Sequence, residues 1–162
     1  FTLNGIAQTA ANTDIKNVAS ATYSDGTTTY DTVSNEVTIT VAKVAGLIIT
    51  PDAGSNPSVV AGQQNVPFVF TVSNTGNFTD DVRFLANGGS ISVVGPATIA
   101  SADVNGTDIF TNGSAVLQSL AQYGSTTVTV YLNINAGAAD GANIQVLLGD
   151  QTTLSPTFDN DA

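Results

Sequence analysis

Three oxygen-bearing side chains in one short loop have the spacing best suited to chemistry in this chain. Asp103, Asn105 and Asp108 place oxygen atoms at the first, third and sixth positions of a loop that also contains Gly106. Carboxylate and amide oxygens are preferred Ca²⁺ ligands, so this loop is a candidate calcium site. It lacks the closing Glu of an EF-hand loop, and Asp, Asn and Gly are equally typical of an ordinary turn.

The residue types that most enzymes rely on are absent. The 162 residues include no His and no Cys, which excludes Ser-His and Cys-His nucleophiles, the usual zinc sites and disulfide bonds. Glycosidases use two carboxylates at a fixed separation in a cleft, whereas the acidic residues here are spread over turn-like segments. We therefore expect no enzymatic activity and no cofactor other than the candidate Ca²⁺.

The charge balance narrows the choice of partners. Three basic residues stand against 13 acidic ones, for a formal net charge of -10. Nucleic acids and anionic membranes require a basic surface, so neither is expected as a partner. No apolar stretch is long enough to insert into a membrane. Low overall charge and abundant Thr, Ser and Asn predict a secreted, cell-surface protein whose signal peptide has been removed.

Side chains open to covalent modification or ligand binding form a second group. Asn-X-Ser/Thr triplets begin at Asn77, Asn105 and Asn112, and they mark loops expected at the surface. Lys16 and Lys43 are candidates for an isopeptide bond beside an acidic group in an apolar pocket, although Lys43 is explained equally well as the end of a surface strand. Arg83 is expected to pair with a nearby Asp.

Aromatic residues that could bind a glycan are few. The chain has no Trp, and its four Tyr residues are dispersed along the sequence. Tyr131 falls on the Thr-rich side of a predicted strand and is the Tyr best placed for exposure. A single cross-strand aromatic is common in sheets, so glycan binding is an alternative and not the main hypothesis.

Alternation of apolar and polar residues predicts an all-β fold. The longest such run covers residues 126–134, and others cover residues 37–41, 68–72 and 144–148. Turn sequences such as Asp25-Gly26 and Asn105-Gly106 separate the runs. The only place where a short helix competes is residues 115–122. Short strands with turns about every ten residues are typical of a β-sandwich.

The pattern divides the chain into three parts. Residues 46–150 read as one sandwich of about a hundred residues, which is an ordinary domain size. Residues 1–45 form a separate N-terminal arm of extended segments, which runs into the sandwich without a Pro or a long linker. Residues 151–162 form a tail or an edge strand.

Several stretches carry a resemblance to a known family. They are the segments at 44–52, 70–77, 124–130 and 135–139, together with 21–26 and 34–41 before them. The chain resembles the immunoglobulin-like repeat domains of unknown function in bacterial and archaeal surface proteins. The resemblance implies an immunoglobulin-like β-sandwich with an N-terminal β-strand extension at the cell surface. It implies nothing about catalysis.

The arm carries the main functional hypothesis. Its apolar residues are expected to be buried against another surface, because a solitary two-stranded hairpin is at most marginally stable in water. Either the arm folds back on its own sandwich, or it completes the sandwich of another copy and builds a pilus-like homopolymer. We favour the polymer, with an acceptor edge near residues 128–134 or 144–148. The alternative is a monomeric surface module that binds a glycan or Ca²⁺. The residues expected to enter the acceptor are Phe1, Leu3, Ile6, Val18, Val37, Ile39 and Val41.

Overall fold

The protein is described here by a computed structural model, which covers residues 8–51 and 58–149. The expected all-β fold is confirmed, since the described residues form 13 strands and one turn of 3-10 helix, η1 (Ala86–Gly88), with no α-helix. The chain divides into two compact units, Phe1–Val44 (unit 1) and Ala45–Ala162 (unit 2). Phe1, Leu3 and Ile6, as well as the tail at 151–162, lie outside the described residues.

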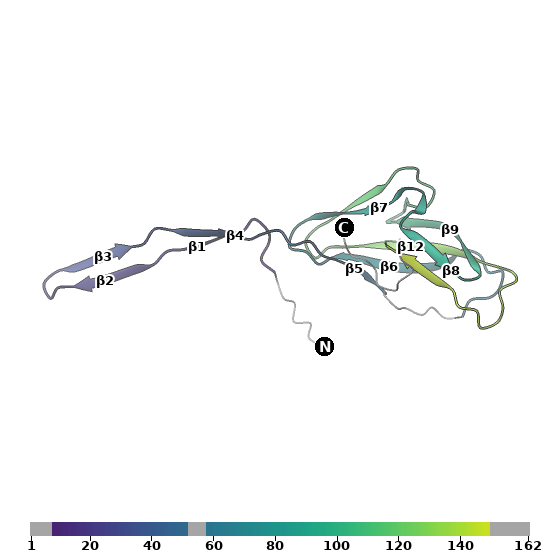
Figure 1. Cartoon of the computed structure of the whole chain (residues 1–162), viewed down its shortest axis with the longest axis horizontal. Coiled ribbons are helices and arrows are strands. Elements are labelled where there is room, and N and C mark those ends of the chain that lie inside the picture. The colour runs from purple at the N-terminus through teal and green to yellow at the C-terminus, as the bar shows by residue number, and fades with distance from the viewer. Residues whose placement is uncertain (1–7, 52–57, 150–162) are drawn as a thin grey trace. The chain divides into compact units, whose positions relative to one another are not determined.

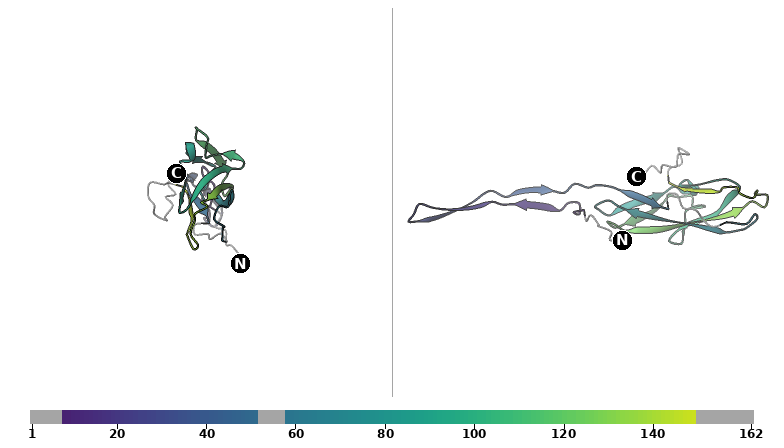
Figure 2. Two further views of the ribbon diagram at one scale, coloured as in Figure 1. Left: turned by 90° about the vertical axis from the view of Figure 1, so that its right-hand side faces the viewer. Right: turned by 90° about the horizontal axis from the view of Figure 1, so that it is seen from below.

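Unit 1 is a two-stranded antiparallel ribbon in two sections (Figures 1 and 2). The section nearer the turn pairs β2 (Ser20–Ser24) with β3 (Thr29–Val33), and the other pairs β1 (Asp14–Asn17) with β4 (Val37–Thr40). The chain reverses at Asp25-Gly26, where Gly26 has a φ of 97°, a conformation that glycine adopts without strain. The Asp-Gly turn signal in the sequence therefore marks the tip of a hairpin.

The two sections of the ribbon are joined by a one-residue bulge. Asn17 lies opposite Val37 in one section, and Ser20 lies opposite Val33 in the other, so the second strand has one residue more between them. The Ser34 backbone N–H donates to the Ala19 carbonyl, and the Ala19 N–H donates to the Ser34 hydroxyl. Two residues, Asn35 and Glu36, are thus left opposite Val18, which is the arrangement of a β-bulge.

Unit 2 contains one five-stranded antiparallel sheet and two separate two-stranded pairs. The sheet has the order β10-β9-β12-β6-β5, and the pairs are β7 with β11 and β8 with β13. The strand bounds in the sheet are β5 (Leu47–Thr50), β6 (Val66–Asn74), β9 (Ala97–Val104), β10 (Thr107–Asp108) and β12 (Ser125–Ile134). Those in the pairs are β7 (Asp80–Phe84), β8 (Ile91–Val94), β11 (Val116–Leu120) and β13 (Gln145–Leu148).

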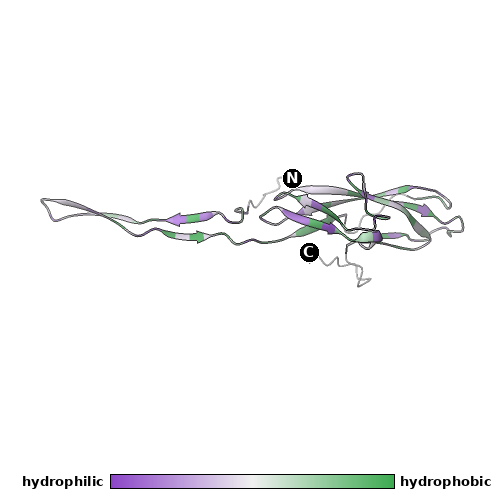
Figure 3. Ribbon diagram, turned by 90° about the horizontal axis from the view of Figure 1, so that it is seen from above, coloured by the Kyte–Doolittle hydropathy of each residue, from purple (hydrophilic) through white to green (hydrophobic). Residues whose placement is uncertain are grey.

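One face of the five-stranded sheet supplies most of the core. Along β12, Val128, Val130 and Leu132 are 0% exposed, while Thr127, just before them, is exposed, as alternation along a strand requires. Both two-stranded pairs add buried residues to the same apolar cluster, among them Phe84, Leu120, Ile91 and Leu148. Figure 3 shows that both hydrophobic and hydrophilic stretches occur in the strands. The core of unit 2 therefore lies between the sheet and the two pairs.

A buried amide links the sheet to one of the pairs. The Asn74 side chain, at the end of β6, is 3% exposed. Its Nδ2 donates to the carbonyls of Leu120 at 3.0 Å and Phe78 at 2.8 Å, and its Oδ1 accepts from the Gly76 N–H at 2.8 Å. These bonds satisfy the buried amide and hold the end of β11 against β6.

One alternative and one expectation from the sequence are wrong. Residues 115–122 contain a strand, β11, in place of the short helix, because pairing with β7 buries Leu120 in the core. Residues 128–134 belong to β12, which has β6 on one side and β9 on the other. A strand with both edges paired has no free N–H and C=O groups to offer, so β12 is not an acceptor edge.

The assignment of one face of β12 to the core can be tested by mutation. Replacing Leu132, which is fully buried, with Ala should lower the free energy of unfolding by about 2–5 kcal/mol, because apolar contacts are lost and a cavity remains. Chemical denaturation followed by circular dichroism measures the change. Thr127→Ala, on the exposed side of the same strand, should stay within about 0.5 kcal/mol of the wild type. Equal losses for the two variants would contradict the assigned core face.

Candidate functional site

The two sides of the β1–β4 section differ in chemistry. Directly opposed residues in an antiparallel pair share a face, so Ile15 with Ile39 and Asn17 with Val37 lie on one side. Asp14 with Thr40 and Lys16 with Thr38 lie on the other. We call the first side the apolar face of the ribbon and the second the polar face.

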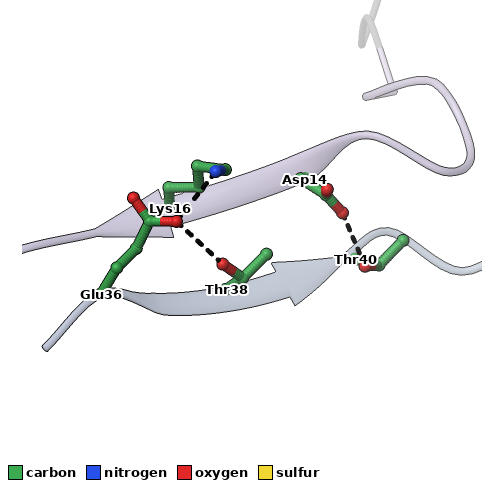
Figure 4. Close-up of polar contacts among 5 residues, drawn as sticks. All are labelled: Asp14, Lys16, Glu36, Thr38 and Thr40. Carbon is green, nitrogen blue, oxygen red and sulfur yellow. Dashed lines mark hydrogen bonds and ion pairs between the residues drawn. The ribbon is translucent and has the colours of Figure 1, made fainter.

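The polar face is held by contacts between its own side chains (Figure 4). The Thr40 hydroxyl donates to Asp14 Oδ1 at 2.7 Å. The Lys16 Nζ lies 2.8 Å from Glu36 Oε1, and the Thr38 hydroxyl donates to the same oxygen at 3.5 Å. An exposed ion pair adds only about 0–1 kcal/mol of stability. These contacts show a face whose polar groups bind one another.

The side chains of the apolar face are exposed. Ile15 is 54% exposed, Val37 60% and Ile39 65%, although these are residues that normally occupy a core. Val41, just beyond β4, is half-buried. Three of the residues expected to enter an acceptor, Val37, Ile39 and Val41, are thus brought close together, and Ile15 joins them. Val18 lies apart from them, beside the bulge, and is also exposed.

Two tyrosines meet near the tip of the ribbon. Tyr23 on β2 lies opposite Tyr30 on β3, with ring centroids 4.9 Å apart and the planes nearly parallel. Tyr23 is 60% exposed and Tyr30 40%. The two residues are seven positions apart in the sequence, and sequence analysis did not predict their contact. The signal that could have found it is the Asp25-Gly26 turn, because counting outward from the turn along both strands places Tyr23 opposite Tyr30. Tyr131 is half-buried, and Tyr123 is exposed.

Asp25 organises the tip. Its Oδ1 accepts from the backbone N–H groups of Thr28 at 2.8 Å and Thr27 at 2.9 Å and from the Thr27 hydroxyl, and its Oδ2 accepts from the Tyr30 hydroxyl at 3.0 Å. These bonds, led by the one from Thr28, stabilise the carboxylate and hold the pKa of Asp25 well below its usual value of 3.8. The charged form of Asp25 is therefore part of the folded turn.

The candidate calcium residues lie in the β9–β10 hairpin and act there as turn residues. Asp103 Oδ1 accepts from the Gly106 N–H, and the Asn105 side chain donates to the Thr126 hydroxyl at 2.8 Å. Asp108 accepts from the Thr111 hydroxyl and from two backbone N–H groups, which lowers its pKa. Across the ranges 8–51 and 58–149, no three acidic side chains gather as a possible metal cluster. The calcium site remains a prediction.

The three acceptor triplets have different surroundings. The Asn105 side chain is exposed and Asn112 is half-buried. Asn77 is only 3% exposed, in contrast to the surface position expected for a glycan acceptor. A buried amide is out of reach of a modifying enzyme in the folded protein, so Asn105 and Asn112 are the candidates that the fold leaves accessible.

The basic residues are surface groups. Lys16 is exposed and bound to Glu36, so it lies in no apolar pocket of the kind that isopeptide bonds require. Lys43 is also exposed. Arg83 lies opposite Leu117 in the β7–β11 pair and, among the described residues, forms no ion pair, which makes the expected Asp partner wrong.

Comparisons with known proteins add no assignment: no family model, curated protein or solved structure matches the chain. In the described ranges, none of the elements is a helix long and apolar enough to span a bilayer. The apolar face of unit 1 and the tyrosine pair are therefore the surfaces on which a function has to be argued.

The low pKa of Asp25 predicts acid sensitivity of the tip. Because the pKa is lower in the folded state than in the unfolded state, the carboxylate stabilises the turn above pH 3.8, and this contribution is lost as the pH falls through 3.8 toward the folded-state value. Asp25→Asn should remove most of this pH dependence. Backbone NMR signals of Thr27 and Thr28, followed from about pH 7 to about pH 2, report it.

The matched control for this experiment is Asp108→Asn, which alters a similarly bonded carboxylate in unit 2. It should leave the titration of the tip unchanged. An identical acid response of the Thr28 amide in the wild type and in Asp25→Asn would show that Asp25 does not hold the turn.

Proposed function

We propose that this protein is a structural subunit of an extracellular, pilus-like filament, and that copies join by β-strand addition. Unit 1 is the donor, and unit 2, taken as an immunoglobulin-like β-sandwich, is the acceptor. The observation that carries the proposal is the apolar face of unit 1, where Ile15, Val37 and Ile39 are each more than half exposed. Fully burying one such side chain contributes about 1.5–3 kcal/mol, so a covering partner would gain several such terms.

Free strand edges in unit 2 support an acceptor role. In the described part of the chain, β5 pairs only with β6 and β13 pairs only with β8. Both strands are uncharged, with the sequences LIIT and QVLL, so they lack the Lys and other charges that commonly protect an edge. Of the two acceptor segments expected from the sequence, the one at 144–148 contains a strand, β13, that is paired on one side only among the described residues.

The symmetry of such a contact favours a filament. A donor on unit 1 and an acceptor on unit 2 are different surfaces, so each copy can both give and receive. A contact of this head-to-tail type that does not close into a ring extends without limit. Main-chain hydrogen bonds would supply affinity, and alternate side chains would supply fit.

One observation favours a second candidate function. Tyr23 and Tyr30 form an exposed aromatic pair, and aromatic surfaces of this kind also bind sugars. A monomeric glycan-binding module would use the tip of the ribbon and would not need the apolar face near β1 and β4. This function would leave Ile15, Val37 and Ile39 exposed, so we rank it second.

Sedimentation velocity and negative-stain microscopy of the full chain test the proposal. We expect large species and filaments from the wild type, and a monomer from a variant that lacks residues 1–44, because the donor is gone. Circular dichroism of the deletion variant checks that unit 2 keeps its strands. A wild-type monomer that binds glycans saturably would overturn the filament and support the second candidate.

A further inference from the structure

We propose that unit 1 docks through one face only: the apolar face continues past the bulge to the tyrosine pair, and this whole face lies on unit 2 of a second copy while the polar face stays in solvent. The inference rests on the proposed filament and deepens it by naming the surface and its partner. Four observations support it: the phase of the strands, the segregation of charge, the cross-strand contacts and the net charge of the chain.

The first strand keeps one phase along its length. Side chains alternate between the two faces of a ribbon, so odd-numbered positions share a side. Ile15 and Asn17 in β1 and Ala21 and Tyr23 in β2 are all odd. The first strand therefore carries the apolar face from its beginning to the tip.

The second strand changes phase at the bulge. Before the bulge Tyr30 and Thr32 are even positions opposite Tyr23 and Ala21, whereas after it Val37 and Ile39 are odd. The extra residue at Asn35-Glu36 makes this change, because two bulge residues oppose a single partner. Without it, Tyr30 and Ile39 would lie on opposite sides. The bulge thus keeps the aromatic and aliphatic residues of both strands on one face.

The resulting faces separate charge within the paired sections and the bulge, whereas at the tip the Asp25 carboxylate accepts from the Tyr30 hydroxyl of the apolar face. The apolar face holds Ile15, Asn17, Ala21, Tyr23, Tyr30, Thr32, Val37 and Ile39, with no charged residue. The charged residues of the paired sections and the bulge, namely Asp14, Lys16, Asp31 and Glu36, all lie on the polar face. Val18 and Val33 are the apolar exceptions there.

Cross-strand side-chain contacts follow the same division. The polar face has the Asp14–Thr40 and Lys16–Glu36 contacts, and the Thr22 hydroxyl donates to Asp31 Oδ1 at 2.6 Å. On the apolar face the contact is the stack of Tyr23 on Tyr30. Tyrosine is among the residues that dominate the binding energy of protein interfaces. One face is therefore suited to water and the other to a protein surface.

The uncharged strand edges of unit 2 favour another copy as the partner. Each chain carries -10, so copies repel one another, and they meet at the lowest electrostatic cost through surfaces without charge. The apolar face of unit 1 and the uncharged edges of β5 and β13 in unit 2 meet that condition. A basic partner would instead be attracted to acidic groups, and in the paired sections of the ribbon these lie on the polar face.

Single cysteines test this directly, because the chain has none of its own. Ile39→Cys marks the apolar face, and the neighbouring Thr38→Cys marks the polar face; both native side chains are exposed in the single chain. Each variant is reacted with a maleimide–polyethylene glycol reagent before and after assembly of the full chain. In filaments we expect labelling of Ile39→Cys to slow by at least about tenfold, as water and reagent leave the centre of an interface, and labelling of Thr38→Cys to stay unchanged.

The outcomes separate the inference from the proposed function. Filaments in which both cysteines react freely, both are protected, or only Thr38→Cys is protected overturn one-face docking and leave the filament standing. An absence of filaments in every form of the protein overturns the proposed function itself.

A pair of charge variants gives an independent readout in case a cysteine disturbs assembly. Ile39→Lys places a cation on the apolar face, and Thr38→Lys places the same cation on the polar face one residue away. We expect the first to raise the concentration needed for assembly by at least about tenfold, because a buried unpaired charge is costly, and the second to leave it within about twofold. Equal effects of the two variants would contradict the inference.

Discussion

A two-stranded ribbon has no second layer, and this constraint governs what unit 1 can be. A sheet in a globular domain covers one face with other elements, but side chains on both faces of a lone ribbon meet water unless something else lies on them. Unit 1 meets the constraint on one face with carboxylates, hydroxyls and an ammonium group that bind one another. On the other face it keeps isoleucine, valine and tyrosine, whose apolar surfaces are not stabilised by contact with water.

Unit 2 shows the ordinary solution to the same problem. Its five-stranded sheet has one face lined by Val128, Val130 and Leu132, and the β7–β11 and β8–β13 pairs contribute to the same core. The Asn74 amide adds a buried polar link between sheet and pair, with its hydrogen-bonding groups satisfied. Both units use the same alternation of residues along their strands. They differ because the apolar face of the sheet in unit 2 shares a core with other strands of the same unit, whereas the apolar side chains of unit 1 are exposed.

Period-two alternation predicted the strands of unit 2 well, because burial on one face leaves a direct mark on the sequence. It predicted β12 to within one residue and the middle of β6. It failed for β11, where Val116, Leu117 and Leu120 are spaced as in a helix and only pairing with β7 makes the strand. The Tyr23–Tyr30 stack was also missed, because cross-strand neighbours depend on register, which the turn and the bulge fix. The partners of Asp103 and Asp108 are local amides and hydroxyls that a sequence pattern does not distinguish from metal ligands.

The bulge also limits how unit 1 can change over evolution. The bulge at Asn35-Glu36 fixes the offset in phase between the two strands. An insertion or loss of one residue elsewhere in a strand would therefore move the side chains beyond it to the other face, and apolar and polar residues would exchange places. Length can therefore vary only in matched two-residue steps on both strands, or through a second bulge that restores the parity. The hairpins of related chains should therefore differ in strand length by even numbers of residues.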